Sequence, residues 1–136
     1  MQFLIVSQKA ITVTRIEQHL HGFGREALLS ATTEKETIQA YRQLDPDENI
    51  NKTIIVELNE PIIEDINTIK AIRKLEEELD VYPAAILTII DYSSVNHEVL
   101  AKMAGSNGFL PQSPSRADIV KELDRILGPN SLVEIV

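Results

Sequence analysis

The most informative segment of the chain reads IIVELNEP and covers residues 54–61. Its first three residues are β-branched and apolar, which is typical of a strand buried on both faces of a parallel sheet. Glu57 follows at the carboxyl end of this run, and Pro61 stands four residues later, where it fits the first turn of a helix. The segment therefore predicts a buried strand that ends in one carboxylate and is followed by a helix.

On either side of this segment, short apolar runs alternate with segments of helical periodicity. The pattern predicts strands at residues 3–6, 27–31, 53–58, 84–90 and 108–111, and helices at residues 10–21, 33–44, 61–79, 94–104 and 115–127. Alternation of this kind indicates a parallel sheet covered by helices on both faces. Five strands favour the flavodoxin-like order 2-1-3-4-5, in which ligands bind at the carboxyl ends of the strands.

Composition sets the class of protein. A length of 136 residues with 43% hydrophobic residues predicts one domain with a sizeable core. We place this domain at residues 1–128 and expect residues 129–136 to be a tail or the start of a linker to a further domain. The net charge of −8 opposes direct binding to nucleic acid or an anionic membrane.

The same composition argues against several locations and chemistries. The apolar runs are far shorter than the ~20 residues that span a bilayer, and no secretion signal is visible, so we expect a cytoplasmic protein. The chain has no cysteine, which excludes disulfides, thiolate metal sites and thiol catalysis.

Two further motifs follow the central segment along the chain. PAAILT at residues 83–88 is an apolar strand that ends in a hydroxyl side chain, and AGSNGFLP at residues 104–111 places an aromatic residue in the last short strand. Together with residues 54–61, their order and spacing resemble the receiver domains of two-component response regulators. The resemblance covers residues 1–127 and implies a CheY-like (βα)5 three-layer sandwich.

The resemblance assigns roles to individual residues. Glu57 stands at the phosphoacceptor position, where the family carries an aspartate, and Phe109 stands at the aromatic switch position. The other reactive positions of the family fall on Ser7, Gln8, Thr88 and Gln112. Ser7 and Gln8 replace the family's acidic metal-binding pair, and Gln112 replaces its lysine.

These replacements remove most of the family's reaction chemistry. Phosphorylation of a carboxylate needs a correctly placed nucleophile, a magnesium ion held by oxygen ligands and a cation near the transferred charge. Ser7 and Gln8 offer neutral oxygens, Gln112 carries no charge, and Glu57 is one methylene longer than aspartate. We therefore predict a degenerate pseudo-receiver that is not phosphorylated at the usual site, with no catalytic residues, no metal and no cofactor.

Two interpretations of Glu57 remain open. It is either a polar strand end that is solvated or paired with Lys9, or it accepts a hydrogen bond from Thr88 and holds Phe109 inward. The second arrangement would bias a two-state element as phosphorylation does.

We expect the output to be a protein contact. In receivers the fourth helix, fifth strand and fifth helix form the surface used for partners and dimers. The resemblance therefore implies a protein partner or a fused effector domain, with a homodimer as a further option, and contact candidates at Glu98, Lys102, Asp118, Lys121 and Arg125. Two alternatives stay open: a receiver that is still phosphorylated in a degenerate way, and a flavodoxin-like module that binds a small molecule near Ser7, Glu57, Thr88 and Gln112.

Other conspicuous residues have structural interpretations. His19 and His21 are two residues apart and do not share a helix face, so with His97 they predict no metal site. Glu76, Glu77 and Glu78 are expected to be a solvated helix end.

Overall fold

The computed structural model describes residues 1–21, 23, 28–48 and 50–128. Strands and helices alternate along the chain in the order β1 (Gln2–Val6), α1 (Ala10–Leu20), β2 (Leu28–Ala31), α2 (Glu34–Gln43), β3 (Lys52–Glu57), α3 (Ile63–Leu79), β4 (Ala85–Ile89), α4 (Val95–Ala104), β5 (Gly108–Leu110) and α5 (Arg116–Leu127). The predicted elements are confirmed to within two residues. The first residue of the predicted second strand and the tail at 129–136 lie outside the described residues.

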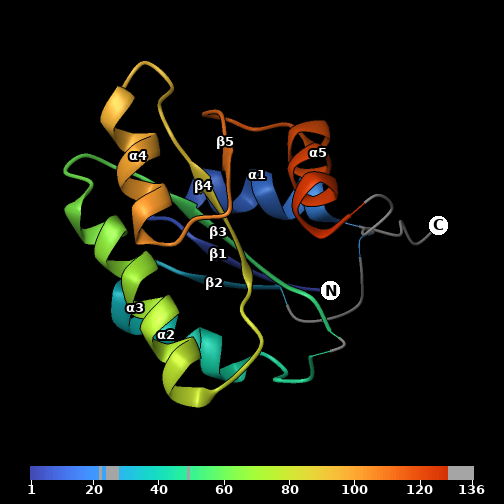
Figure 1. The fold of residues 1–136 in the computed structure, drawn as a ribbon. Coiled ribbons are helices and arrows are strands. Elements are labelled where there is room, and N and C mark those ends of the chain that lie inside the picture. Colours follow the sequence, from blue (N-terminus) through green and yellow to red (C-terminus); the bar gives the residue numbers. More distant parts are fainter. Residues whose placement is uncertain (22, 24–27, 49, 129–136) are drawn as a thin grey trace.

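The five strands form one parallel sheet in the order β2-β1-β3-β4-β5. Figure 1 shows α2, α3 and α4 on one face of the sheet and α1 and α5 on the other. The predicted CheY-like flavodoxin fold is therefore confirmed. None of the described helices has the length and apolar character needed to cross a membrane.

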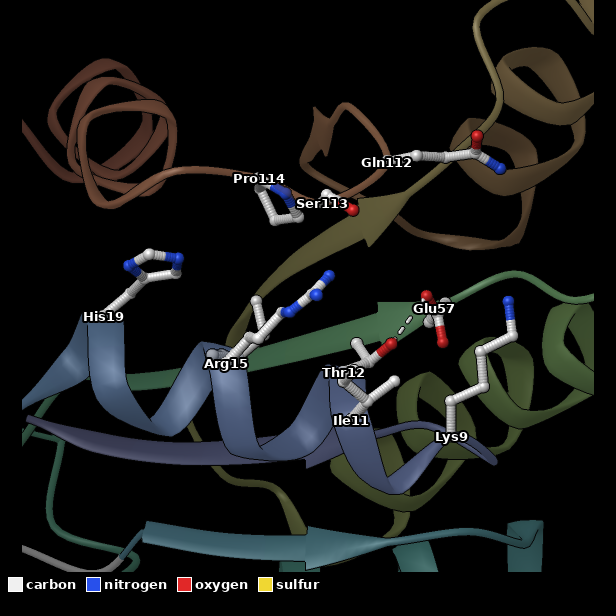
Figure 2. Close-up of a pocket in the computed structure, with 10 residues that line it drawn as sticks. Lys9, Ile11, Thr12, Arg15, His19, Glu57, Gln112, Ser113 and Pro114 are labelled. Carbon is white, nitrogen blue, oxygen red and sulfur yellow. Dashed lines mark hydrogen bonds between the residues drawn. The ribbon is translucent and has the colours of Figure 1, made fainter.

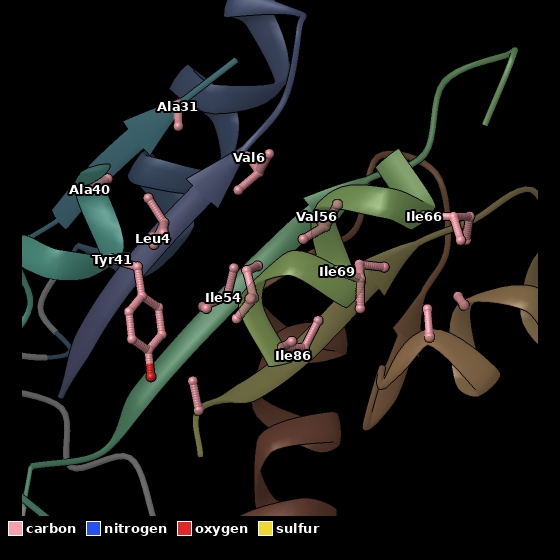
Figure 3. Close-up of a cluster of buried hydrophobic side chains, with 14 of the residues drawn as sticks. Leu4, Val6, Ala31, Ala40, Tyr41, Ile54, Val56, Ile66, Ile69 and Ile86 are labelled. Carbon is pink, nitrogen blue, oxygen red and sulfur yellow. The ribbon is translucent and has the colours of Figure 1, made fainter. Parts of the chain in front are cut away.

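The core has two halves, one on each face of the sheet. Leu4, Ile54 and Ile86 face α2, α3 and α4, where they pack in one cluster with Tyr41 and Ile69 (Figure 3). The cluster on the other face contains alternate residues of the same strands, including Ile55 and Leu87, and packs against α1 and α5. Since side chains alternate along a strand, this register also fixes the face to which every polar residue of the sheet belongs.

Side-chain caps define the starts of two helices. Thr33 caps α2 by accepting a hydrogen bond from the Glu36 backbone N–H at 3.1 Å. The Glu36 carboxylate in turn accepts a hydrogen bond from the Thr32 hydroxyl at 2.6 Å. This hydrogen bond lowers the pKa of Glu36. In α5, Ser115 and Asp118 form a reciprocal capping box, which fixes the point where the β5–α5 loop becomes helical.

The expectation of a solvated helix end at Glu76 is wrong. Glu76 is only 4% exposed, and its carboxylate accepts hydrogen bonds from the Tyr41 hydroxyl at 2.8 Å, the Ala84 N–H at 2.6 Å and Arg73 Nη1 at 2.6 Å. A buried carboxylate is tolerated when it is paired in this way. Burial, and then the hydrogen bond and charge of Glu76, raise the pKa of Tyr41.

Arg73 extends this cluster to the connection between α4 and β5. Its guanidinium donates to the Gly105 carbonyl from Nε at 3.0 Å and from Nη2 at 2.8 Å, and to Asn107 Oδ1 at 2.7 Å. The same Asn107 oxygen accepts from the Ile86 N–H at 2.8 Å. The side chains of Arg73, Glu76 and Asn107 thus link α2, α3 and the α4–β5 connection to the amino end of β4.

Candidate functional site

Glu57 lies half-buried at the carboxyl end of β3, and two hydroxyl groups hold its carboxylate. Ser7 Oγ donates to Oε1 at 2.7 Å. Thr12 Oγ1 donates to Oε2 at 3.1 Å, and Figure 2 shows this second bond. Because β1 and β3 are parallel neighbours, with Val6 opposite Val56, the residue after β1 stands directly beside Glu57. Ser7 itself is buried.

The structure corrects both expected partners of Glu57. Within the described residues, no ion pair or hydrogen bond joins Glu57 to Lys9 or to Thr88, and the carboxylate accepts instead from Ser7 and Thr12. The serine predicted as a lost metal ligand is therefore the direct partner of the carboxylate. Thr12 carried no sequence signal for this role beyond its place in the first turn of α1.

Thr88 points into the opposite half of the core. It is 0% exposed, and its hydroxyl donates to Ser106 Oγ at 2.7 Å. In the sheet it pairs with Val56, while Glu57 pairs with Ile89. Thr88 shares a strand face with Ile86, whereas Glu57 shares one with Ile55, so the interpretation in which Glu57 accepts a hydrogen bond from Thr88 is wrong.

Magnesium, which the fold family implies here, does not suit this donor set. Gln8 and Gln112 are exposed amides, and both Glu57 oxygens already accept hydrogen bonds. Magnesium is usually bound through one or two carboxylates at near-octahedral geometry. Among the described residues, no group of three His, Asp or Glu side chains is placed to hold a metal ion.

A second carboxylate near Glu57 was missed in the sequence. Asp65 in the first turn of α3 is buried, and its Oδ2 accepts a hydrogen bond from the Asn59 N–H at 2.8 Å. Burial is the main cause that raises the pKa of Asp65, and the charges of Glu64 and Glu57 add to it. Asp65 therefore fixes the loop after β3 without being aimed at a ligand.

A cavity of about 300 Å³ lies beside Glu57, between α1 and the β5–α5 loop. Figure 2 shows α1 along one side of this cavity and the loop along the other. The lining residues are Lys9, Ile11, Thr12, Arg15, Ile16, His19, Glu57, Gln112, Ser113 and Pro114. Of the four residues expected to surround a small-molecule pocket, only Glu57 and Gln112 line this cavity.

Comparison with known proteins agrees with this architecture. No protein-family model matches the chain, and no curated protein matches it. Among solved structures, chemotaxis response regulator CheY4 of Vibrio cholerae matches with a TM-score of 0.70 at 19% identity, covering 92% of this chain and 97% of that one. The chain has the receiver fold.

Two further neighbours show what proteins of this fold bind. The receiver domain of the Saccharomyces cerevisiae response regulator Ssk1, crystallised with the phosphotransfer protein Ypd1, matches at a TM-score of 0.74 and 18% identity over 93% of this chain and 88% of that one. The receiver domain of a Pseudomonas aeruginosa sensor histidine kinase, with magnesium in its active-site cleft, matches at 0.69 and 19% over 93% and 97%. At these identities the likeness establishes the fold alone.

The receiver fold places the predicted partner-face residues in different settings. Glu98, Lys102 and Arg125 line one cavity of about 380 Å³ together with Tyr92 and Phe109. Burial, and then the charges of Glu122, Glu98 and Asp118, raise the pKa of Tyr92.

The other two predicted partner-face residues lie differently. Asp118 is engaged in the α5 capping box, and Lys121 lines a separate groove on α5. The structure therefore brings three of the five candidates together.

Phe109 is partly buried and packs against the core cluster that faces α2, α3 and α4. Its backbone N–H donates to Glu122 Oε2 at 3.1 Å. This bond and, more strongly, the Arg125 side chain lower the pKa of Glu122. The role of Phe109 as a switch residue stays a prediction.

His97 joins α4 to the loop after β3. Its Nε2 lies 2.7 Å from Glu60 Oε1, and the residue is only 8% exposed. This contact between α4 and the loop that begins at Glu57 was not predicted, because Glu60 and His97 are far apart in the sequence.

Proposed function

We propose that the chain is a receiver-like signalling module that works through protein contacts and is not phosphorylated at Glu57. The observation that carries this proposal is the state of the Glu57 carboxylate, whose two oxygens accept hydrogen bonds from Ser7 and Thr12. We propose no enzymatic activity of its own and a cytoplasmic setting.

The chemistry around Glu57 supports this proposal. Formation of an acyl phosphate needs a free nucleophilic oxygen, a metal ion and a cation that stabilises the transferred charge. Here the nucleophile is hydrogen-bonded by hydroxyls, the neighbouring oxygens are neutral, and Gln112 is uncharged. A displacement of about 1 Å in a reacting group can reduce the rate ~100-fold, and glutamate is longer than aspartate by more than that.

The outer surface of α4 supports a role in protein contact. Val99, Leu100 and Met103 are exposed apolar residues on this helix, and Met103 is 79% exposed. Exposed apolar groups that lie together mark interaction sites more often than single ones do. The neighbouring cavity lined by Glu98, Lys102 and Arg125 adds charges of both signs, which suits a partner protein, a fused effector domain or a second copy of the chain.

A titration with magnesium and beryllofluoride, a mimic of the phosphoryl group, tests the absence of phosphorylation. We expect the amide resonances of residues near Glu57 to stay unchanged in nuclear magnetic resonance spectra, and no phosphoryl adduct to appear by intact mass after incubation with acetyl phosphate. The magnesium-binding receiver from Pseudomonas aeruginosa serves as the positive control. Saturable shifts near Glu57, or an adduct on it, would instead favour degenerate phosphorylation.

Sedimentation velocity tests the contact surface with the chain alone. If the chain self-associates through α4, Met103→Lys should shift it toward the monomer, because a charge would be buried in the interface. Tyr82→Lys is the matched control, since Tyr82 is also an exposed residue, at 63%, but lies ahead of β4. Equal behaviour of the two variants would argue against a homodimer through this face.

A further inference from the structure

We infer that the cavity between α1 and the β5–α5 loop binds a small organic anion through a carboxylate or phosphoryl group. This inference does not rest on the proposed function, because its central side chains, Arg15 and His19 on α1 and Ser113 in the loop, are not positions to which the resemblance assigns a role in phosphorylation, although Glu57 and Gln112 also line the cavity. Its basis is the combination of charge, size and lining in one partly open cavity.

The charge of this cavity is opposite to that of the whole protein. The chain carries a net charge of −8, yet Lys9, Arg15 and His19 line the cavity against one carboxylate, that of Glu57. Ser7 and Thr12 are neutral donors, so this carboxylate still counts as one negative charge against the two positive charges of Lys9 and Arg15, with His19 formally neutral. The local field is positive, which raises the concentration of anions in such a cleft.

Arg15 and His19 form the centre of the proposed site. They are four residues apart on α1 and therefore lie on one face of the helix. In Figure 2 both side chains rise from α1 toward the loop that carries Ser113 and Pro114. A guanidinium presents two parallel N–H donors that match a carboxylate or a phosphoryl group equally well. The expected ligand therefore carries one of these two anionic groups.

The size and walls of the cavity limit the ligand. A volume of about 300 Å³ stands at the lower end of the range for small-molecule sites, which favours a small metabolite over a flavin or a dinucleotide. Ile11, Ile16 and Pro114 provide apolar walls for a short carbon skeleton. Gln112 and Ser113 provide amide and hydroxyl groups that can bind a hydroxyl substituent.

The loop on the far side of the cavity adds an independent observation. Ser113 has a φ of 52°, in the left-handed region that residues other than glycine rarely adopt. Backbone strain of this kind is concentrated at ligand clamps and active sites. The strained residue lines the cavity.

Titration of the full chain with two anions tests the site. Inorganic phosphate and malate are added separately at constant ionic strength, and malamide is the uncharged analogue. We expect saturable shifts of the backbone amides of Arg15, His19 and Ser113 with at least one anion and none with malamide. A response to malate alone identifies a carboxylate site, and a response to phosphate alone identifies a phosphoryl site.

Substitution then locates the binding. Arg15→Gln should weaken the responding anion about tenfold or more, since hydrogen bonds to charged groups contribute about 1.5–3 kcal/mol. Arg42→Gln removes the same charge from an exposed position on α2 and should leave the affinity unchanged. His19→Gln is a second variant that does not depend on Arg15. The inference is overturned if neither anion gives saturable shifts at millimolar concentration, or if Arg15→Gln and Arg42→Gln weaken binding equally.

Discussion

The two ends of the sheet handle charge in opposite ways. At the carboxyl end, the half-buried Glu57 is held by the neutral hydroxyls of Ser7 and Thr12. At the amino end, the buried Glu76 is paired with Arg73 and is also bonded by Tyr41 and a backbone N–H. A charged pair thus stabilises the end that holds the layers together, whereas the carboxylate at the end where receivers carry out their reaction is bonded directly by neutral hydroxyls.

This difference indicates which substitutions the fold should tolerate. A buried ion pair becomes strongly destabilising when one partner is removed, because the other charge stays buried and uncompensated. A half-buried carboxylate that loses a hydroxyl donor can be rehydrated at small cost. We therefore expect the amino end of the sheet to be sensitive to substitution and the carboxyl end to be permissive.

Arg73→Ala is the largest test of this comparison. It removes all the guanidinium bonds to Glu76, Gly105 and Asn107, and we expect a loss of about 3–5 kcal/mol in the free energy of unfolding. Urea denaturation provides the measurement. The control Lys74→Ala changes an exposed neighbour on the same helix and should stay within about 0.5 kcal/mol of the original protein. A loss below 1 kcal/mol for Arg73→Ala would mean that the cluster contributes little.

Gly105→Ala should weaken the same end through packing. A methyl group there would meet Arg73 Cγ at 2.6 Å, and the glycine has a φ of +124°, so we expect a cost of about 2–3 kcal/mol from strain and displacement of Arg73. Gly128→Ala is the matched control, because its φ is also positive, at +101°, but nothing lies within 4 Å of the added methyl. Equal thermal midpoints for the two variants would show that only the backbone conformation matters.

Ser7→Ala tests the permissive end. It removes the 2.7 Å hydrogen bond to Glu57 and the 3.0 Å hydrogen bond that Ser7 Oγ accepts from the Lys9 N–H, and we expect a loss of about 1–2 kcal/mol, since each such bond contributes about 0.5–1.5 kcal/mol net. The urea midpoint is again the measurement. A loss as large as that of Arg73→Ala would contradict the contrast between the two ends.

The pH dependence of the free energy of unfolding should report on the buried carboxyl group of Asp65, which lies at the carboxyl end of the sheet. Burial raises its folded-state pKa above the ordinary value of 3.8, so the folded chain holds this proton more tightly than the unfolded chain does. Stability from this group is fully present below the ordinary pKa and decreases as pH rises through the raised value. Asp65→Asn should remove this decrease. Chemical denaturation of the original protein and of the variant at several pH values between acidic and neutral would show whether their stabilities depend differently on pH.

The smallest expected effect is that of Glu57→Gln on the shape of the domain. Glu57 and Thr88 face opposite halves of the core, so amide shifts should be confined to residues near Ser7 and Thr12. Changes that extend to Phe109 or Ser106 would instead support an active-like state fixed by Glu57.

Sequence patterns predicted the sheet order and the element bounds because short apolar runs and helical periodicity are local signals. The predicted fourth strand at residues 84–90 is longer than β4 by one residue at each end. Glu76 was misassigned because a run of acidic residues at a helix end is usually solvated, and its partners Tyr41 and Arg73 are recognisable only in three dimensions. The cationic lining had a partial signal in the spacing of Arg15 and His19.

The uneven anchoring of α4 has a mechanical consequence. Near its carboxyl end the helix is tied down through Gly105 by two Arg73 bonds. Toward its amino end the side-chain tie is the contact between His97 and Glu60. The side chain of Glu60 is 73% exposed, and contacts to exposed charges contribute little, so we expect any displacement of α4 to begin near His97 and not near Gly105.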